Sequence, residues 1–408
     1  MLTVPRRLLQ ITGAIYNPQL IKPIQGCYKL IQEDEFQDNS ESRALFMQLL
    51  AESSDANAGN RAHFTFLRLV GDPDQAVTGW SGGLLDAPTR MGEILHARVL
   101  TKMQNSPIEL TLEECEGAVT SLPVSLRCPV SHINLANEAY DNAYGEGGYA
   151  SDAISKPDPE RTTRMVPKDG AIEGVIVQDA TFGKEGEYLM GLVEECNPSE
   201  RVGTLFRRGL DASDVSEVLT LYGFAHILAL ADKKLTPMTH IRAPLRLLVQ
   251  MSDAPEPDAD APPPPPGTLL RSTTVSDLLI NLPIGGVVGV IDGMRASCIR
   301  KLASELAPTA SMHDLMAHAE YRFSSFECSR LRLTTAHAAK GQTFRTTVIC
   351  QPQLFPLERN VTEGGIGLVQ EPKVEYVALT RATHRIVFMV EADNSHQDTS
   401  YETLYFEL

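Results

Sequence analysis

The sequence predicts an α/β protein built on parallel β-sheets. Two β-rich runs, residues 27–32 and 64–70, each end in a turn of acidic and amide side chains. Helical runs such as Arg43–Ser53 separate the predicted strands, of which a third lies near residues 107–112. In parallel α/β sheets the ligand crevice lies at the carboxyl ends of the strands. We therefore expect the two polar turns to share one binding edge.

Composition limits the classes of protein that fit this fold. With 408 residues, 43% of them hydrophobic and 22% charged, the chain is long enough for two or three globular domains with buried cores. A net charge of −16 argues against a uniformly basic surface for nucleic acid, but it leaves room for a local basic groove.

Cysteine usage and hydropathy predict an intracellular protein without a membrane partner. Seven cysteines form no C-x-x-C pair and no zinc spacing, which favours reduced thiols. The first residues, M-L-T-V-P-R-R-L-L-Q, are a weak match to a signal peptide because Pro5 and Gly13 interrupt a short apolar run. No run approaches the ~18 apolar residues of a spanning helix.

The first polar turn, I-Q-E-D-E-F-Q-D-N-S at residues 31–40, crowds four carboxylates together: Glu33, Asp34, Glu35 and Asp38. Neighbouring like charges repel, and their burial without partners costs several kcal/mol. A strand that delivers such a cluster at its end needs a cation, and magnesium on a nucleotide is the natural candidate. The alternative is a solvated acidic turn.

The second polar turn follows the run F-T-F-L-R-L-V at residues 64–70 and reads G-D-P-D-Q. It ends at Gln75, and the only tryptophan, Trp80, follows between glycines. Because both strands end in an amide-bearing turn, we expect the two turns to form one surface that senses phosphate.

Five motifs in order resemble those of the UvrD/Rep-type superfamily 1 DNA helicases. They are D-E-F-Q-D at 34–38, V-G-D-P-D-Q at 70–75, L-R-C-P with I-N-L-A-N at 126–137, T-A-H-A-A-K-G at 335–341 and Y-V-A-L-T-R-A at 376–382. The resemblance extends from Leu30 to about Val390. It implies two RecA-like lobes, the first incomplete, and ATP-driven 3′ to 5′ translocation on DNA with unwinding.

The resemblance also implies domain boundaries. Residues 1–118 are expected to form the partial first RecA-like domain and residues 119–250 the first part of the second. Residues 251–329 are then a shortened insertion, and residues 330–408 close the second domain.

By the same resemblance, ATP and Mg²⁺ bind between the lobes. Asp34 is expected to hold the magnesium ion, Glu35 to polarise the attacking water and Gln75 to sense the γ-phosphate. Arg127 and Arg381 reach the γ-phosphate from the second lobe, and an arginine in such a role contributes ~10³–10⁵ in turnover. Gly341 belongs to the turn that faces the nucleotide.

The expected partner is single-stranded or partly duplex DNA. Trp80 matches the aromatic residue that stacks on a base, with core filling as the alternative, and Thr335 and His337 match positions that contact DNA and couple it to ATP. The arginines of residues 201–210 fit either a DNA-backbone contact or a solvated face.

The chain departs from the family pattern in two respects. Six motif positions carry unusual residues: Thr78, Ser81, Ser125, Leu126, Gln342 and Thr343. Also, no stretch matches the phosphate-binding loop G-x-x-x-x-G-K-[ST], which supplies backbone N–H groups, a lysine and a hydroxyl to the phosphates and magnesium. We expect either a truncated part of a working helicase or a remnant that binds DNA or a protein without hydrolysing ATP.

Residues 251–269 are acidic and then proline-rich, with five consecutive prolines at 262–266. Such a composition predicts a stiff, extended and exposed connector. A partner that recognises the proline run is the alternative. Residues 311–320 follow with the spacing of an amphipathic helix.

Three further elements are expected within the motifs. Apolar residues recur at helical spacing after Pro129, which is a natural helix-start residue. Residues 331–344 read as a strand that runs into a glycine-containing turn, and residues Glu371–Ala382 as a helix that carries Arg381.

Overall fold

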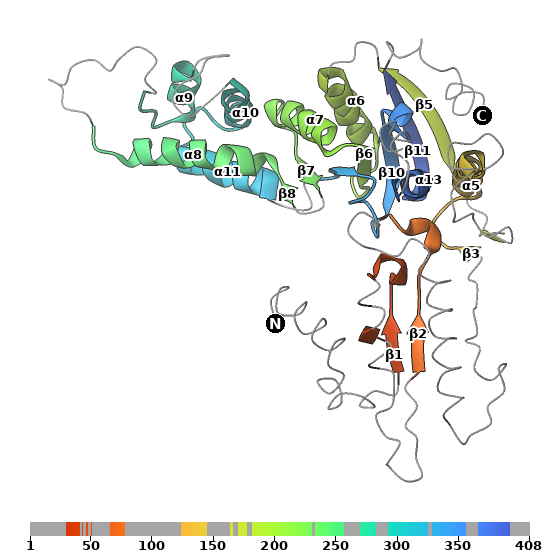
Figure 1. Cartoon of the computed structure of the whole chain (residues 1–408). Coiled ribbons are helices and arrows are strands. Elements are labelled where there is room, and N and C mark those ends of the chain that lie inside the picture. Colours follow the sequence, from red (N-terminus) through yellow and green to blue (C-terminus); the bar gives the residue numbers. More distant parts are fainter. Residues whose placement is uncertain are drawn as a thin grey trace, which may run out of the picture. The chain divides into compact units, whose positions relative to one another are not determined.

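A computed structural model describes most of the C-terminal two thirds of the chain and two short stretches near its start (Figure 1). The described residues are 30–40, 43, 46–47, 50, 66–77, 124–144, 164–165, 170–177, 182–230, 233–256, 270–282, 293–324, 329–355 and 366–391. The chain divides into two compact units, described separately below. The first comprises Met1–Ser125, Ala136–Arg164 and Pro356–Val377, and the second comprises Leu126–Leu135, Met165–Phe355 and Ala378–Leu408.

The first unit contains two short parallel strands, β1 (Leu30–Glu33) and β2 (Phe66–Leu69), paired over their whole length. Each strand leads into a single turn of 3₁₀-helix, η2 (Phe36–Asp38) or η3 (Pro73–Gln75). The predictions of strands at residues 27–32 and 64–70 are thus confirmed where these residues are described. The strand predicted near residues 107–112 lies outside the described residues.

Two helices contribute to the first unit with one part each: α5 (Val130–Tyr144) and α13 (Ile366–Leu379). Within that unit the Tyr140 ring lies 4.8 Å from the Tyr144 ring and 6.0 Å from the Tyr376 ring, measured between centroids. The Tyr144 hydroxyl donates to the Val369 carbonyl at 3.1 Å. The helix predicted after Pro129 is therefore present, and its apolar spacing becomes a buried aromatic cluster. Strands β3 (Val124–Ser125) and β4 (Arg164–Met165) form a separate two-stranded sheet.

The second unit is built on a seven-stranded, mostly parallel sheet with the order β5-β11-β10-β6-β9-β7-β8. All neighbouring strands are parallel except β7 and β8, which are antiparallel. The strands are β5 (Ala171–Val177), β6 (Val202–Phe206), β7 (His226–Ala229), β8 (Lys234–Leu235), β9 (Leu331–Thr335), β10 (Phe344–Cys350) and β11 (Ala382–Glu391).

Helices α6 (Phe182–Glu195) and α7 (Gly209–Leu221) pack together on this sheet (Figure 1). Their apolar side chains form one buried core with side chains from six of the strands, β5, β6, β7, β9, β10 and β11. Leu205, Ile349 and Phe388, which are not part of that core, are buried as well. A parallel sheet is expected to have both faces covered, and accordingly every residue of β6 and every residue of β10 except Arg345 is buried.

A cluster of four helices lies between β8 and β9 in the sequence. It consists of α8 (Pro237–Asp253), α9 (Val275–Asn281), α10 (Gly293–Ser304) and α11 (Met312–Ser324). One apolar core is shared by all four. The helix predicted from residue 311 is confirmed as α11, and Ser311 caps it by accepting from the Asp314 N–H at 3.1 Å. No helix in the described part of the chain is long and apolar enough to cross a membrane.

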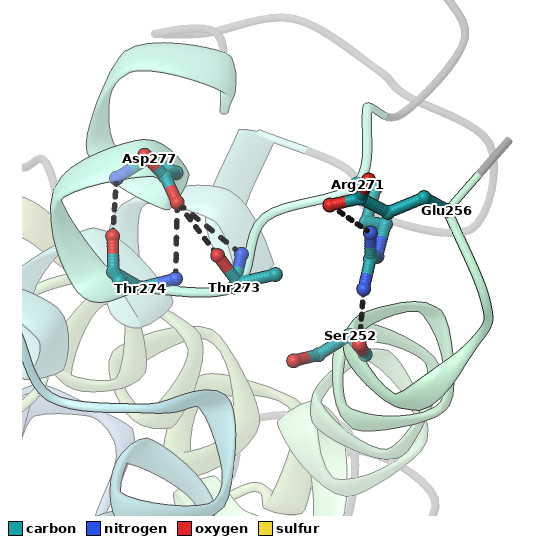
Figure 2. A network of polar contacts seen from close by, with 6 residues as sticks. All are labelled: Ser252, Glu256, Arg271, Thr273, Thr274 and Asp277. Carbon is teal, nitrogen blue, oxygen red and sulfur yellow. Dashed lines mark hydrogen bonds and ion pairs between the residues drawn. The ribbon is translucent and has the colours of Figure 1, made fainter. Parts of the chain in front are cut away.

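The two ends of the proline-rich stretch are held together on this helix cluster (Figure 2). Arg271 donates to the Ser252 carbonyl at 3.1 Å, and its other terminal nitrogen lies 3.8 Å from a carboxylate oxygen of Glu256. Beside it, Asp277 accepts from the N–H groups of Thr273 and Thr274 at the start of α9. Because α8 and α9 share one core, the stretch begins and ends on the same cluster and does not connect two domains, as a linker would. Residues 257–269 lie outside the described residues.

Candidate functional site

The two polar turns predicted from the sequence follow the C-terminal ends of the paired strands β1 and β2 in the first unit. Beyond the paired strands, the Val70 N–H donates to the Glu33 carbonyl at 2.9 Å, and the Phe36 N–H donates to the Val70 carbonyl at 3.0 Å. These bonds continue the ladder past the strand ends. The backbone on either side of Asp34 and Glu35 is therefore hydrogen-bonded to Val70, the residue that precedes the G-D-P-D-Q turn.

Glu35 has an unusual backbone conformation, with φ 53° and ψ 42°, which is the left-handed region. Its own N–H donates to a carboxylate oxygen of Asp34 at 2.9 Å. A residue with a side chain in this region costs of order 1–3 kcal/mol and occurs preferentially at functional sites. Both carboxylates are exposed.

Gln37 joins the first turn to the second. Its side chain is fully buried, and its amide nitrogen donates to a carboxylate oxygen of Glu35 at 2.5 Å. The amide oxygen of Gln37 accepts from the Asp72 backbone N–H at 3.1 Å. Gly71 permits this approach, because a Cβ there would clash with that same oxygen.

Asp72 in turn orients Gln75. One carboxylate oxygen of Asp72 accepts from the Gln75 side-chain amide at 2.8 Å, and the other accepts from the Asp74 N–H at 3.0 Å. The structure thus brings together Glu35 and Gln75, two predicted site residues 40 positions apart, through Gln37 and Asp72.

Sequence reasoning did not single out Gln37 or Asp72. Both lie inside the motifs D-E-F-Q-D and G-D-P-D-Q, so the signal was present in the motifs themselves. It was missed because the roles of a buried amide and of a carboxylate that binds its own turn depend on contacts between segments.

The second unit brings the two predicted arginines to one turn. Arg127 donates to the Thr380 carbonyl at 3.4 Å, and the Cys128 thiol lies 3.2 Å from the same oxygen. Arg381 is the next residue along the chain. Its side chain is fully buried, and one guanidinium nitrogen donates to the Thr380 hydroxyl at 2.9 Å.

The end of the last predicted helix differs from the sequence expectation. We expected a helix over Glu371–Ala382 with Arg381 on it, but α13 ends at Leu379 and β11 begins at Ala382. Arg381 therefore lies in the bend between them, where its carbonyl accepts from the Phe344 N–H at 3.0 Å. The β-branched Thr380 and the start of the next strand end the helix earlier than apolar spacing alone suggests.

The T-A-H-A-A-K-G motif forms a tight turn after β9. The Thr335 hydroxyl accepts from the Ala338 N–H at 3.2 Å, and Gly341 has a φ of 74°, which explains the glycine. Gln342 donates to the Ala338 carbonyl and accepts from Arg332, both at 2.6 Å. The Gln342 side chain, at one of the unusual motif positions, is thus hydrogen-bonded within the turn and to β9. His337 is partly buried.

The described residues hold no group of three or more His, Cys, Asp and Glu side chains arranged to bind a metal ion. Magnesium that arrives with a nucleotide needs only one or two carboxylates, because phosphate oxygens and water supply the remaining ligands. The exposed Asp34 carboxylate fits that limited role. Trp80, Thr78 and Ser81 lie outside the described residues, so the base-stacking role remains a prediction.

Comparison with known proteins supports the motif assignment. Residues 2–91 match the family model of the UvrD/REP helicase N-terminal domain. The match confirms the resemblance to UvrD-like helicases, and it includes both polar turns. The motifs at 126–137, 335–341 and 376–382 lie beyond it. No curated protein matches the chain.

Among solved structures, the chain is similar to the C-terminal domain of a possible DNA helicase from Lactobacillus plantarum WCFS1. The two share 7% sequence identity, and the match covers 65% of this chain and 88% of the other with a TM-score of 0.27.

Proposed function

We propose that this chain is the motor part of an ATP-dependent DNA helicase of the UvrD/Rep type, with two RecA-like lobes that move 3′ to 5′ on single-stranded DNA. The observation that carries the proposal is the hydrogen-bonded connection between Glu35 and Gln75 at the end of paired parallel strands. The family match over residues 2–91 supports it independently. DNA as substrate implies a location inside the cell.

The residues divide the chemistry between them in this proposal. Asp34 binds the magnesium ion that accompanies ATP, and Glu35 accepts a proton from the water that attacks the γ-phosphate. Gln75 senses that phosphate through its side-chain amide. Such transfer relies on positioning and on neutralising charge, so cations are needed on both sides of the phosphate.

Arg127 and Arg381 are the proposed cations from the second lobe. Their common attachment to Thr380 supports this pairing, because both guanidinium groups depend on the position of one turn. Gly341, with its positive φ, shapes the turn of residues 335–341, which in this proposal faces the nucleotide. Thr335, His337 and Trp80 are the proposed contacts to DNA.

The chain as written lacks the phosphate-binding loop, and we propose that it does not turn over ATP by itself. Each good donor to a developing charge contributes roughly 3–4 kcal/mol, and the missing loop removes a lysine and several N–H groups together. Activity is expected to fall by several orders of magnitude.

DNA-stimulated phosphate release tests the proposal. The assay compares the 408-residue chain with a version extended upstream to include any phosphate-binding loop encoded there, each with Glu35→Gln as the inactive control. Activity only in the extended version, lost in Glu35→Gln, supports the proposal. Hydrolysis by the short chain at ordinary helicase rates contradicts the dependence on the loop.

The second candidate is a helicase remnant that binds DNA or a protein without hydrolysing ATP. The fully buried side chain of Arg381 and the engagement of Gln342 within its own turn favour it. Trp80→Ala separates the two kinds of partner, because loss of a stacked base weakens single-strand binding by about 1–3 kcal/mol. Binding to DNA must also weaken as salt rises, whereas binding that is independent of salt indicates a protein partner.

A further inference from the structure

Gln37 has surroundings that only an amide side chain satisfies. It is fully buried, it donates to the carboxylate of Glu35, and it accepts from the Asp72 N–H. A buried polar side chain destabilises the fold unless its donors and acceptors are paired. A carboxylate at this position could accept but not donate, and an apolar side chain could do neither.

The bonds of Gln37 continue through Asp72 to Gln75, so that one chain of contacts runs Glu35–Gln37–Asp72–Gln75. We propose that Gln37 is a positioning residue for ATP hydrolysis, which sets the water-activating carboxylate and, through Asp72, the phosphate-sensing amide as one unit. This inference rests on the proposed function of Glu35 and Gln75.

The physical reason lies in the exposure of the two end groups. Glu35 is exposed and Gln75 is only partly buried, so packing alone does not fix their side chains. A hydrogen bond to a charged carboxylate is stronger than one between neutral groups and is more directional than packing. The buried amide of Gln37 therefore restrains the side chain of Glu35 directly and that of Gln75 through Asp72.

The first test uses the 408-residue chain without nucleotide. Gln37→Met removes the acceptor for the Asp72 N–H and is expected to speed hydrogen exchange at that amide up to about tenfold, since a net hydrogen bond contributes up to about 1.5 kcal/mol and a factor of ten corresponds to about 1.4 kcal/mol. Gln37→Glu keeps an acceptor of the same length, so exchange should stay within about threefold of the unmodified chain. Residue-resolved exchange by NMR measures both.

The second test uses the version of the protein that hydrolyses ATP. Gln37→Glu is expected to lower kcat about tenfold to hundredfold with KM for ATP nearly unchanged, as loss of a supporting partner around an active group typically does. Asn39→Asp is the matched control. Asn39 is a buried amide in the same turn, and its side chain donates to Glu33 at 3.2 Å.

The outcomes distinguish a failure of the positioning role of Gln37 from a failure of the proposed ATP hydrolysis. Equal exchange at Asp72 in Gln37→Met and the unmodified chain overturns the contact. Loss of activity in Glu35→Gln combined with normal kcat in Gln37→Glu, or an equal loss in Asn39→Asp, overturns the positioning role while the proposed function stands. If no version hydrolyses ATP, the proposed function fails and the positioning role with it, while the exchange experiment still decides the contact.

Discussion

The acidic turns of the first unit and the arginine turn of the second unit are stabilised in different ways. In the first unit, side chains hold one another at an exposed strand end, through Gln37 and Asp72. In the second unit, Arg127 and Arg381 both bind Thr380, and Arg381 is fully buried. The comparison teaches that a substitution in the first turn changes the geometry of the site locally, whereas one in the second affects the stability of the unit.

The largest expected effect follows from the burial of Arg381. Arg381→Ala removes a large, fully buried side chain and leaves a cavity, so we expect a loss of about 2–4 kcal/mol in the free energy of unfolding. Urea denaturation measures it. Arg127→Ala, which removes a partly buried side chain with a long hydrogen bond, is the matched control and should cost about 1 kcal/mol or less. Equal losses in the two variants would show that the burial of Arg381 is not what makes this turn important for the stability of the unit.

Acid should destabilise the second unit through His226 on β7. Burial lowers the pKa of this imidazole to about 4, and its nitrogens lie 2.8 Å from the Phe224 carbonyl and 2.7 Å from the Ser216 hydroxyl. The carbonyl can only accept, so the neutral imidazole donates to it and accepts from the hydroxyl. The buried environment thus favours the neutral imidazole.

The sign follows from that preference. The unfolded chain binds the proton more readily between pH 6.5 and about 4, so stability is complete above pH 6.5 and is lost as the pH falls through this window. A shift of this size corresponds to roughly 3 kcal/mol. Urea denaturation across this pH range, with His226→Asn compared with the exposed His313→Gln, measures it. A pH dependence that survives in His226→Asn shows that other groups carry it.

A smaller effect is expected in the first unit from Gly71→Ala. The added Cβ clashes with the amide oxygen of Gln37, which is the far end of a side chain and can move away. Because Gly71 itself is exposed, we expect displacement of the Gln37 side chain and faster exchange at the Asp72 N–H, with little change in global stability. Gly191→Ala is a suitable control, since its Cβ would meet open space. A large drop in the unfolding midpoint for Gly71→Ala would contradict the local nature of this site.

Much of the framework could be predicted from the sequence. Apolar runs that end in acidic or glycine-containing turns gave β1, β2 and β9, and apolar spacing after Pro129 gave α5. These signals are local, because they depend on side-chain periodicity and on turn residues close in sequence. For the same reason the motifs indicated Glu35 and Gln75.

The rest depends on contacts between distant segments. The order of the seven strands, the bonds from Gln37 to Asp72 and the attachment of Arg127 to Thr380 join residues between 35 and 253 positions apart. The early end of α13 was also missed, because apolar side chains continue from the helix into β11 and periodicity does not mark the change. The DNA contacts proposed for Trp80, Thr335 and His337 stay predictions.

The attachment of Arg271 to Ser252 has a consequence for variation in chain length. Arg271, just after this segment, contacts Ser252 and Glu256, just before it. The fold therefore already holds the two ends of the segment between Glu256 and Leu270 close together on the helix cluster. Lengthening such a closed loop costs only the added entropy of closure, about 0.6 kcal/mol for each doubling of its length. This position can therefore accept an inserted peptide or a fluorescent label while the four helices keep their common core.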